Sequence, residues 1–159
     1  MSYEVAIGIV VAAVFAALIF SSAGAATSTS TYVRRAVLTD SELRFFLRLV
    51  EAVAEGDYVC PQLGMAAAIE ARGRNAKAVF AAFRRISQKR IDFCVCDARL
   101  VPKLVVELDD RTHDPARDRA RDALLLSAGI QTLRFDVRRM PTTPQLRSAI
   151  ATAQRGSIK

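Results

Sequence analysis

The chain has 159 residues, of which 25% are charged and 52% hydrophobic, and it carries a formal net charge of +7. This length leaves room for one domain of about 120 residues and an appendage, and such a domain can bury a core without disulfides or structural metals. The excess of Lys and Arg predicts attraction to polyanions such as nucleic acids; a merely solvated basic surface and attraction to anionic lipid are the alternatives.

The N-terminal region begins with a long uncharged run. Residues 5–26 contain no charged side chain, and 22 residues rising about 1.5 Å each would span the hydrocarbon core of a bilayer. We therefore predict a single-pass transmembrane helix over residues 4–26. A signal peptide cleaved near Ala23-Gly24-Ala25 is the alternative, although basic residues are missing in front of the apolar run.

The charges after this run predict the topology. The first positive residues are Arg34 and Arg35, so the positive-inside rule leaves the N-terminus outside and places the rest of the chain in the cytoplasm, at the inner membrane. The Ser/Thr-rich stretch within residues 27–36 is then a flexible linker, and residues 37–153 form an α/β domain.

The domain is predicted to begin with a capped helix. Thr39-Asp40-Ser41-Glu42 matches a capping box, with Thr39 as N-cap and Glu42 at the third helical position. Apolar residues then recur at helical spacing until Gly56, which can end the helix: Leu43, Phe46, Leu47, Val50, Val53 and Ala54. Glu42 thus has a structural role in the cap, and a contact with a metal ion, as an accessory acid, is the alternative.

A short strand and a second helix follow. Residues 58–63 predict a strand in which Pro61 marks an edge or a break. Residues 64–76 predict a loop or a partial helix. Residues 77–85 predict a basic amphipathic helix whose apolar side chains face the core, namely Val79, Phe80 and Phe83.

Residues 89–96 read Lys-Arg-Ile-Asp-Phe-Cys-Val-Cys and predict a buried strand with one carboxylate, Asp92, near its start. The three cysteines, Cys60, Cys94 and Cys96, cannot all pair with one another. Cys94 and Cys96, two apart on this strand, are interpreted as small core residues of a protein in a reducing compartment. A zinc site would need further ligands that the sequence does not supply, so no zinc finger is expected.

The next strand ends in acidic residues. Residues 105–113 read Val-Val-Glu-Leu-Asp-Asp-Arg-Thr-His, and strand alternation places Glu107 and Asp109 on one face. Only 14 residues, including a turn, separate Asp92 from Glu107, so antiparallel pairing brings both to one end of a sheet. Crowded carboxylates favour Mg²⁺ or Mn²⁺ between them, and the only histidine, His113, can transfer protons. A solvated acidic turn is the alternative.

The remaining sequence predicts a helix, a strand and a last helix. Asp114-Pro115 opens a helix that runs to about Ser127, and its Arg and Asp residues predict a solvated, salt-bridged face. Arg134 lies near the end of the strand at residues 130–135, where it projects toward a phosphate or pairs with Asp122. The order of elements predicts an α/β sandwich with a central mixed sheet flanked by helices.

These motifs together resemble a known family. Asp92, a hairpin and then Glu107-x-Asp109 resemble the core of the PD-(D/E)XK nucleases, which have the restriction-endonuclease-like fold. The pattern is most similar to family 2726 of bacterial domains of unknown function, and it also resembles very-short-patch-repair endonucleases. Four separated motifs over residues 33–150 carry this resemblance: Leu38 to Glu42, Ile86 to Phe93, Glu107 to His113, and Arg121-Asp122 with Leu133-Arg134.

The resemblance implies a metal-dependent nuclease. Asp92, Glu107 and Asp109 would hold Mg²⁺ or Mn²⁺, His113 would transfer a proton, and cationic side chains would bind the phosphates of DNA, which is favoured over RNA: Lys89, Arg90 and Arg134. One departure weakens the expectation of catalysis, because Asp109 replaces the lysine of the Glu-x-Lys motif. The rival hypotheses are an inactive nuclease-fold module that binds nucleic acid or a protein, and a plain membrane-anchored structural protein.

Overall fold

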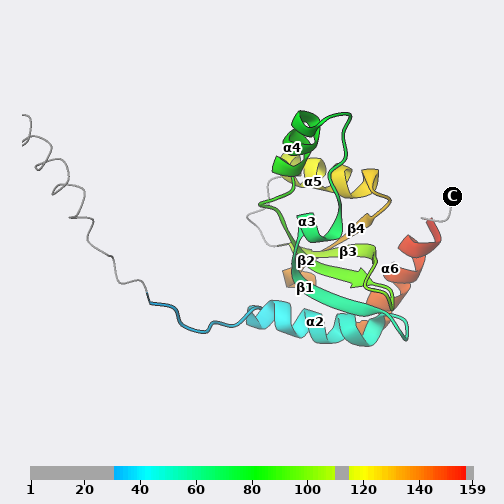
Figure 1. The fold of residues 1–159 in the computed structure, drawn as a ribbon. Helices are drawn as coiled ribbons and strands as arrows, with labels where there is room; N and C mark the ends of the chain where they lie inside the picture. The colour runs from blue at the N-terminus through cyan, green and yellow to red at the C-terminus, as the bar shows by residue number, and fades with distance from the viewer. Residues whose placement is uncertain (1–30, 110–114, 157–159) are drawn as a thin grey trace, which may run out of the picture. The chain divides into compact units, whose positions relative to one another are not determined.

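The computed structural model describes residues 31–109 and 115–156 (Figure 1). The predicted membrane anchor and His113 lie outside these residues. In the described part of the chain, no helix combines the length and the apolar character needed to cross a bilayer.

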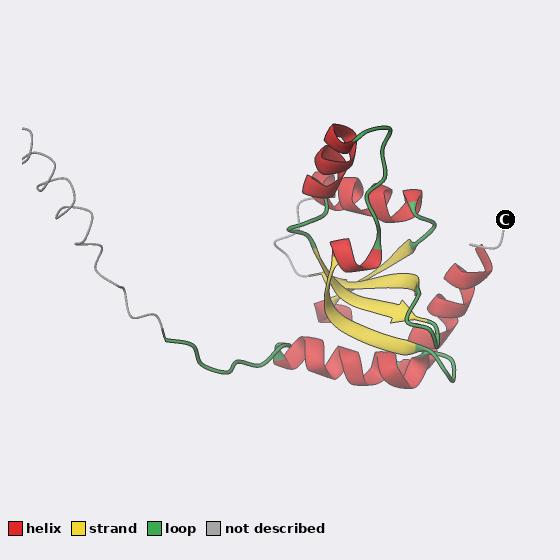
Figure 2. Cartoon of the chain, in the orientation of Figure 1, coloured by secondary structure: helices red, strands yellow, loops and turns green. Residues whose placement is uncertain are grey.

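Four strands form one mixed sheet in the order β1-β2-β3-β4 (Figure 2). They are β1 (Tyr58–Gly64), β2 (Arg90–Cys96), β3 (Pro102–Asp109) and β4 (Gln131–Asp136). β1, β2 and β3 pair antiparallel in sequence order, whereas β4 runs parallel to β3 because α5 connects them. The predicted mixed sheet flanked by helices is therefore confirmed.

One face of the sheet is covered by α2 (Asp40–Ala52) and α6 (Thr143–Gly156). The capping box that starts α2 is confirmed, since the Thr39 backbone N–H donates to Glu42 Oε2 at 2.7 Å. This face holds the larger apolar cluster, in which Phe45 packs on Phe93 with ring centroids 5.3 Å apart. α2 ends at Ala52, before the predicted stop, and Gly56 with φ of +83° turns the chain toward β1 instead.

The opposite face is covered by α3 (Met65–Ala68) and α5 (Pro115–Ser127), with α4 (Ala76–Arg84) beyond them (Figure 1). Its apolar cluster is smaller and includes Met65, Ile91, Leu125 and the buried Cys94 and Cys96. The cysteines are free thiols, as expected for core residues, and burial raises the pKa of Cys94. A short 3-10 turn, Val137–Arg139, links β4 to α6.

The prediction that Phe80 and Phe83 face the core was wrong. Their exposures are 62% and 45%, and α4 contributes no fully buried residue. The physical reason is its placement: α4 lies outside the sheet layer, so no strand covers its apolar face.

Candidate functional site

Asp92 and Glu107 lie side by side at the end of the β2–β3 ladder. Regular pairing of the two strands starts with Phe93 opposite Val106, which leaves the two acidic residues facing each other just beyond it. Asp92 Oδ2 accepts a hydrogen bond from the backbone N–H of Leu108 at 3.1 Å. The Asp92 carboxylate thus accepts the Leu108 N–H in place of a backbone carbonyl of the neighbouring strand, and this bond holds it where the ladder ends.

Glu107 is the most unusual side chain of this site, because it is a carboxyl group with only 1% exposure. Burial, together with the neighbouring Asp92, raises the pKa of Glu107 from 4.5 to about 8, although the positive charge of Arg121 acts in the opposite direction. Its Oε1 atom has no hydrogen-bond partner among the described residues. A buried acid with an unused acceptor is costly unless a proton or a cation reaches it.

α5 supplies the cation nearest to Glu107. Arg121 Nη2 lies 3.1 Å from Glu107 Oε2 and 3.5 Å from Asp118 Oδ1. The approach to Glu107 is an ion pair and not an aligned hydrogen bond, since Nη2 meets no acceptor at a suitable angle. Because only 17% of the Arg121 side chain is exposed, the predicted solvated face of α5 is wrong at this position.

A second arginine holds Asp109. Arg134 Nη1 is 2.9 Å from Asp109 Oδ1, and its Nη2 is 3.1 Å from Asp122 Oδ1. The ion pair with Asp122 that the sequence offered as one alternative is therefore present. Asp109 shares a face with Glu107 as expected, and its carboxylate is bonded to Arg134. In the residues that the structure describes, no three His, Cys, Asp or Glu side chains are grouped so as to hold a metal ion.

Among the described residues, the cluster holds more acidic than basic side chains. Arg121 and Arg134 pair with four carboxylates, and Asp92 lies beside one of these, Glu107: the four are Glu107, Asp109, Asp118 and Asp122. When all are ionised, the described part of the cluster has an excess of negative charge. Such an excess next to an unused Glu107 oxygen suits a divalent cation held by Asp92 and Glu107.

Glu42 is bonded to Gln62, whose backbone lies across from Asp92. The Oε2 atom of Glu42 caps α2, and its Oε1 atom accepts a hydrogen bond from Gln62 Nε2 at 3.2 Å. The pairs on either side, Pro61 with Phe93 and Leu63 with Ile91, place Gln62 opposite Asp92 in the register of the two strands. Gln62 has a φ of +52°, a strained value for a residue with a side chain. The structural role of Glu42 in the cap is confirmed.

The predicted phosphate-binding residues border the site. Lys89 helps to line a hollow of about 430 Å³ together with Arg84, Arg85 and Ala120. Arg90 is exposed, and its carbonyl oxygen lies 3.5 Å from Arg121 Nη1. Arg121 and Gln62 were not predicted as site residues. The motif Arg121-Asp122 was the available signal for Arg121, whereas the sequence around Gln62 carried none.

One protein-family model matches most of the chain. The model of the family described as "Protein of unknown function (DUF2726)" matches residues 34–154. This chain belongs to the DUF2726 family. The match covers every described element from α2 to β4 and most of α6, and with them the carboxylate pair and both arginines. No curated protein and no solved structure matches the chain.

Proposed function

We propose that this DUF2726 protein is a divalent-metal-dependent nuclease of the PD-(D/E)XK type, tethered to the inner membrane with its domain in the cytoplasm. The observation that carries the proposal is the Asp92–Glu107 pair, two adjacent carboxyl groups at the end of a ladder, one of them buried with a free acceptor. Cations border this pair on α5 and at the start of β2, as phosphodiester binding requires.

Each residue has a role in the proposed reaction. Asp92 and Glu107 would hold Mg²⁺ or Mn²⁺, which supplies Lewis-acid stabilisation of the charge that develops on the phosphoryl oxygens. Arg121 and Arg134 would hold the carboxylates in position. Each would offer positive charge to the phosphate when its guanidinium group leaves a carboxylate and binds a phosphate oxygen instead. Asp109, bonded to Arg134, would orient that arginine and complete the metal site only if the ion pair opens. Lys89 and Arg90 would contact flanking phosphates, with DNA favoured as the substrate.

The replacement of the motif lysine favours a second candidate function. Asp109 stands where the resembled nucleases have a cation, and both Asp109 and Glu107 are already paired with arginines. A module that binds nucleic acid without cleaving it would show the same cluster. In the nuclease proposal, Arg121 and Arg134 supply from α5 and β4 the positive charge that β3 itself lacks.

Cleavage assays separate the two candidates. The full-length chain, purified with detergent, is incubated with plasmid, linear and single-stranded DNA and with RNA, in Mg²⁺, in Mn²⁺ and in EDTA. We expect metal-dependent cleavage that Asp92→Asn abolishes and that Asp40→Asn, an exposed acid in the first turn of α2, leaves unchanged. Binding without cleavage in either metal would establish the inactive module instead.

His113 is proposed as the proton-transfer group, on sequence grounds alone. His113→Gln should then lower cleavage by roughly 10²- to 10⁴-fold while folding and nucleic-acid affinity are kept. If the variant cleaves at the wild-type rate, His113 has only a structural role near the start of α5.

The membrane tether is proposed from the uncharged run at residues 5–26 and from Arg34 and Arg35. Fusions of alkaline phosphatase and of a fluorescent protein to the C-terminus report opposite sides of the membrane. We expect fluorescence without phosphatase activity, and an active phosphatase would reverse the topology.

A further inference from the structure

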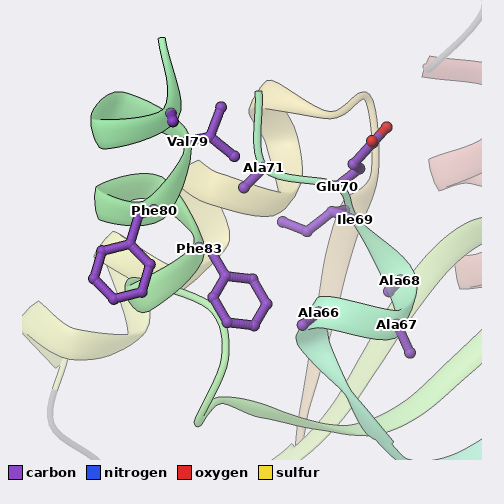
Figure 3. A pocket seen from close by; sticks show the side chains of 10 residues that line it. Ala66, Ala67, Ala68, Ile69, Glu70, Ala71, Val79, Phe80 and Phe83 are labelled. Carbon is purple, nitrogen blue, oxygen red and sulfur yellow. The ribbon is translucent and has the colours of Figure 1, made fainter. Parts of the chain in front are cut away.

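α4 exposes two phenylalanines beside an apolar groove. The groove has a volume of about 640 Å³ and lies between α4 and the segment of residues 66–71. Phe80 and Phe83 form its α4 wall, with exposures of 62% and 45% (Figure 3). Figure 3 shows the Phe83 ring turned toward α3 and the Phe80 ring at the outer rim. Neighbouring exposed aromatic rings are uncommon on a surface that contacts only water, and such patches often mark interaction sites.

Positive side chains surround these rings. Lys77 and Arg84 are exposed on the flank of α4 that adjoins Phe80, because residues three and four apart share a helix face. Arg72 and Arg74 come from the preceding loop. Gly73 brings that loop against α4: a Cβ atom there would lie 2.9 Å from the backbone nitrogen of Val79. The loop and its arginines are thus held against the helix.

The groove contains one carboxylate among its lining residues. Glu70 is 75% exposed and pairs with Arg72 at 3.1 Å. Because this pair is at the surface and neutral as a unit, Glu70 does not offset the positive charges of Lys77, Arg74 and Arg84.

This pattern of rings and cations fits one class of ligand. Unpaired nucleotides present flat bases that stack on aromatic side chains, and phosphates that cations bind. In a duplex the same base faces are stacked on one another and are not available to Phe80 and Phe83. An apolar peptide or a lipid chain would use the rings but would not account for the exposed Lys77 and Arg84 on the flank of α4 that adjoins Phe80.

The residues that follow Phe83 line a second hollow. Arg84 directly follows Phe83 and lines this hollow with Arg85, Lys89 and Ala120. The next residue of α5, Arg121, contacts Glu107 at 3.1 Å. Cationic residues therefore occur on the segments between α4 and the proposed site of hydrolysis.

We propose that α4 and residues 66–71 form a binding groove for unpaired nucleotides, with bases stacked on Phe80 and Phe83 and phosphates bound by Lys77 and Arg84. The proposal rests on the proposed function, because it names single-stranded nucleic acid, or a duplex with a locally opened strand, as the substrate class.

Binding in EDTA tests the groove without cleavage. Anisotropy is measured with the full-length chain and a labelled DNA strand of about 12 nucleotides, the same strand with abasic sites, and a duplex. Phe80→Leu/Phe83→Leu keeps apolar side chains and removes the rings; it should weaken single-strand binding by roughly ten-fold or more and leave duplex binding nearly unchanged. Tyr58→Ala, an exposed aromatic residue at the far end of the sheet, is the matched control and should bind like the wild type.

Several results would overturn the groove. One is a double Leu variant that binds the single strand as tightly as the wild type does, and another is a wild-type chain that binds the abasic strand as tightly as the intact strand. A wild-type chain that binds no single strand at all would also contradict the proposal. The last is binding of anionic lipid vesicles that is lost when the same two phenylalanines are replaced. The outcome is separable from the proposed function. If the chain cleaves nucleic acid in the presence of metal and the double Leu variant binds single strands like the wild type, only the proposed groove is disproved. If single-strand binding depends on the two rings but no cleavage occurs, only the proposed nuclease activity is disproved.

Discussion

The two faces of the central sheet differ although the same strand builds both. Along β3, Leu104, Val106 and Leu108 point to the face that α2 and α6 cover, where they join a continuous apolar cluster. The alternate residues Glu107 and Asp109 point to the α5 face and meet arginines. Because side chains alternate between the two faces of a strand, the eight residues of β3 supply apolar side chains to the core on one face and carboxylates to the charged cluster on the other.

The difference shows where the protein can tolerate strain. The α2–α6 face contains packed aromatic rings and the larger of the two apolar clusters, and burial of apolar surface is the main source of folding free energy. The α5 face keeps a buried acid whose unused oxygen works against stability. The folding free energy contributed by the apolar core on one face offsets the cost of burying the carboxylate pair on the other.

Removing a ring from the α2–α6 face should have the largest effect. Phe93 is fully buried and contacts Phe45 and Phe46, so Phe93→Ala should lower the free energy of unfolding by about 3–5 kcal/mol. Urea unfolding followed by circular dichroism measures it. Phe80→Ala is the matched control, since its ring is exposed and its loss should cost little. Equal losses in both variants would contradict the difference between the faces.

Changing Glu107 should affect activity more than folding. Because Gln has the shape of a protonated Glu, Glu107→Gln should preserve the fold, yet it removes a charge that the proposed metal site needs. Loss of several kcal/mol of transition-state stabilisation would lower cleavage by roughly 100-fold or more. Initial rates in Mn²⁺, compared with the unfolding midpoint of the same preparation, measure both. A variant that cleaves normally would remove Glu107 from the site.

The pH dependence of stability tests the buried acid directly. Because the pKa of Glu107 is about 8 in the folded protein and near 4.5 in the unfolded chain, the folded state binds more protons between these values. Stability should therefore fall as pH rises through this window, by roughly 2 kcal/mol between pH 6 and pH 8. Metal-free unfolding of the wild type and of Glu107→Gln gives the difference. A wild type that loses no more stability than the variant would show that Glu107 is ionised throughout.

The smallest effect is expected at the start of α2. Thr39→Ala removes the hydroxyl that accepts from the Glu42 backbone and should cost about 1 kcal/mol of stability. Cleavage should be unchanged if Glu42 has only its capping role. A fall in the cleavage rate larger than the fall in the folded fraction would instead reveal that Glu42, through Gln62, acts on the carboxylate pair.

The sequence by itself determined the elements and one half of the site. Helical and strand periodicities depend on neighbouring residues, so the cap at Thr39, the four strands and their order along the chain could be predicted, whereas the order of the strands in the sheet was not. The approach of Asp92 to Glu107 was also predictable, because a short hairpin leaves antiparallel pairing as the simple solution.

Only the tertiary structure decided what those carboxylates meet. Arg121 reaches Glu107 from α5, and Arg134 reaches Asp109 because β4 runs parallel beside β3; neither contact follows from spacing along the chain. The same holds for α4, whose apolar residues have the spacing of a core helix but lie exposed beside a groove. A pattern of side chains defines a face, whereas the packing of distant segments decides whether that face meets the core, a charge or the solvent.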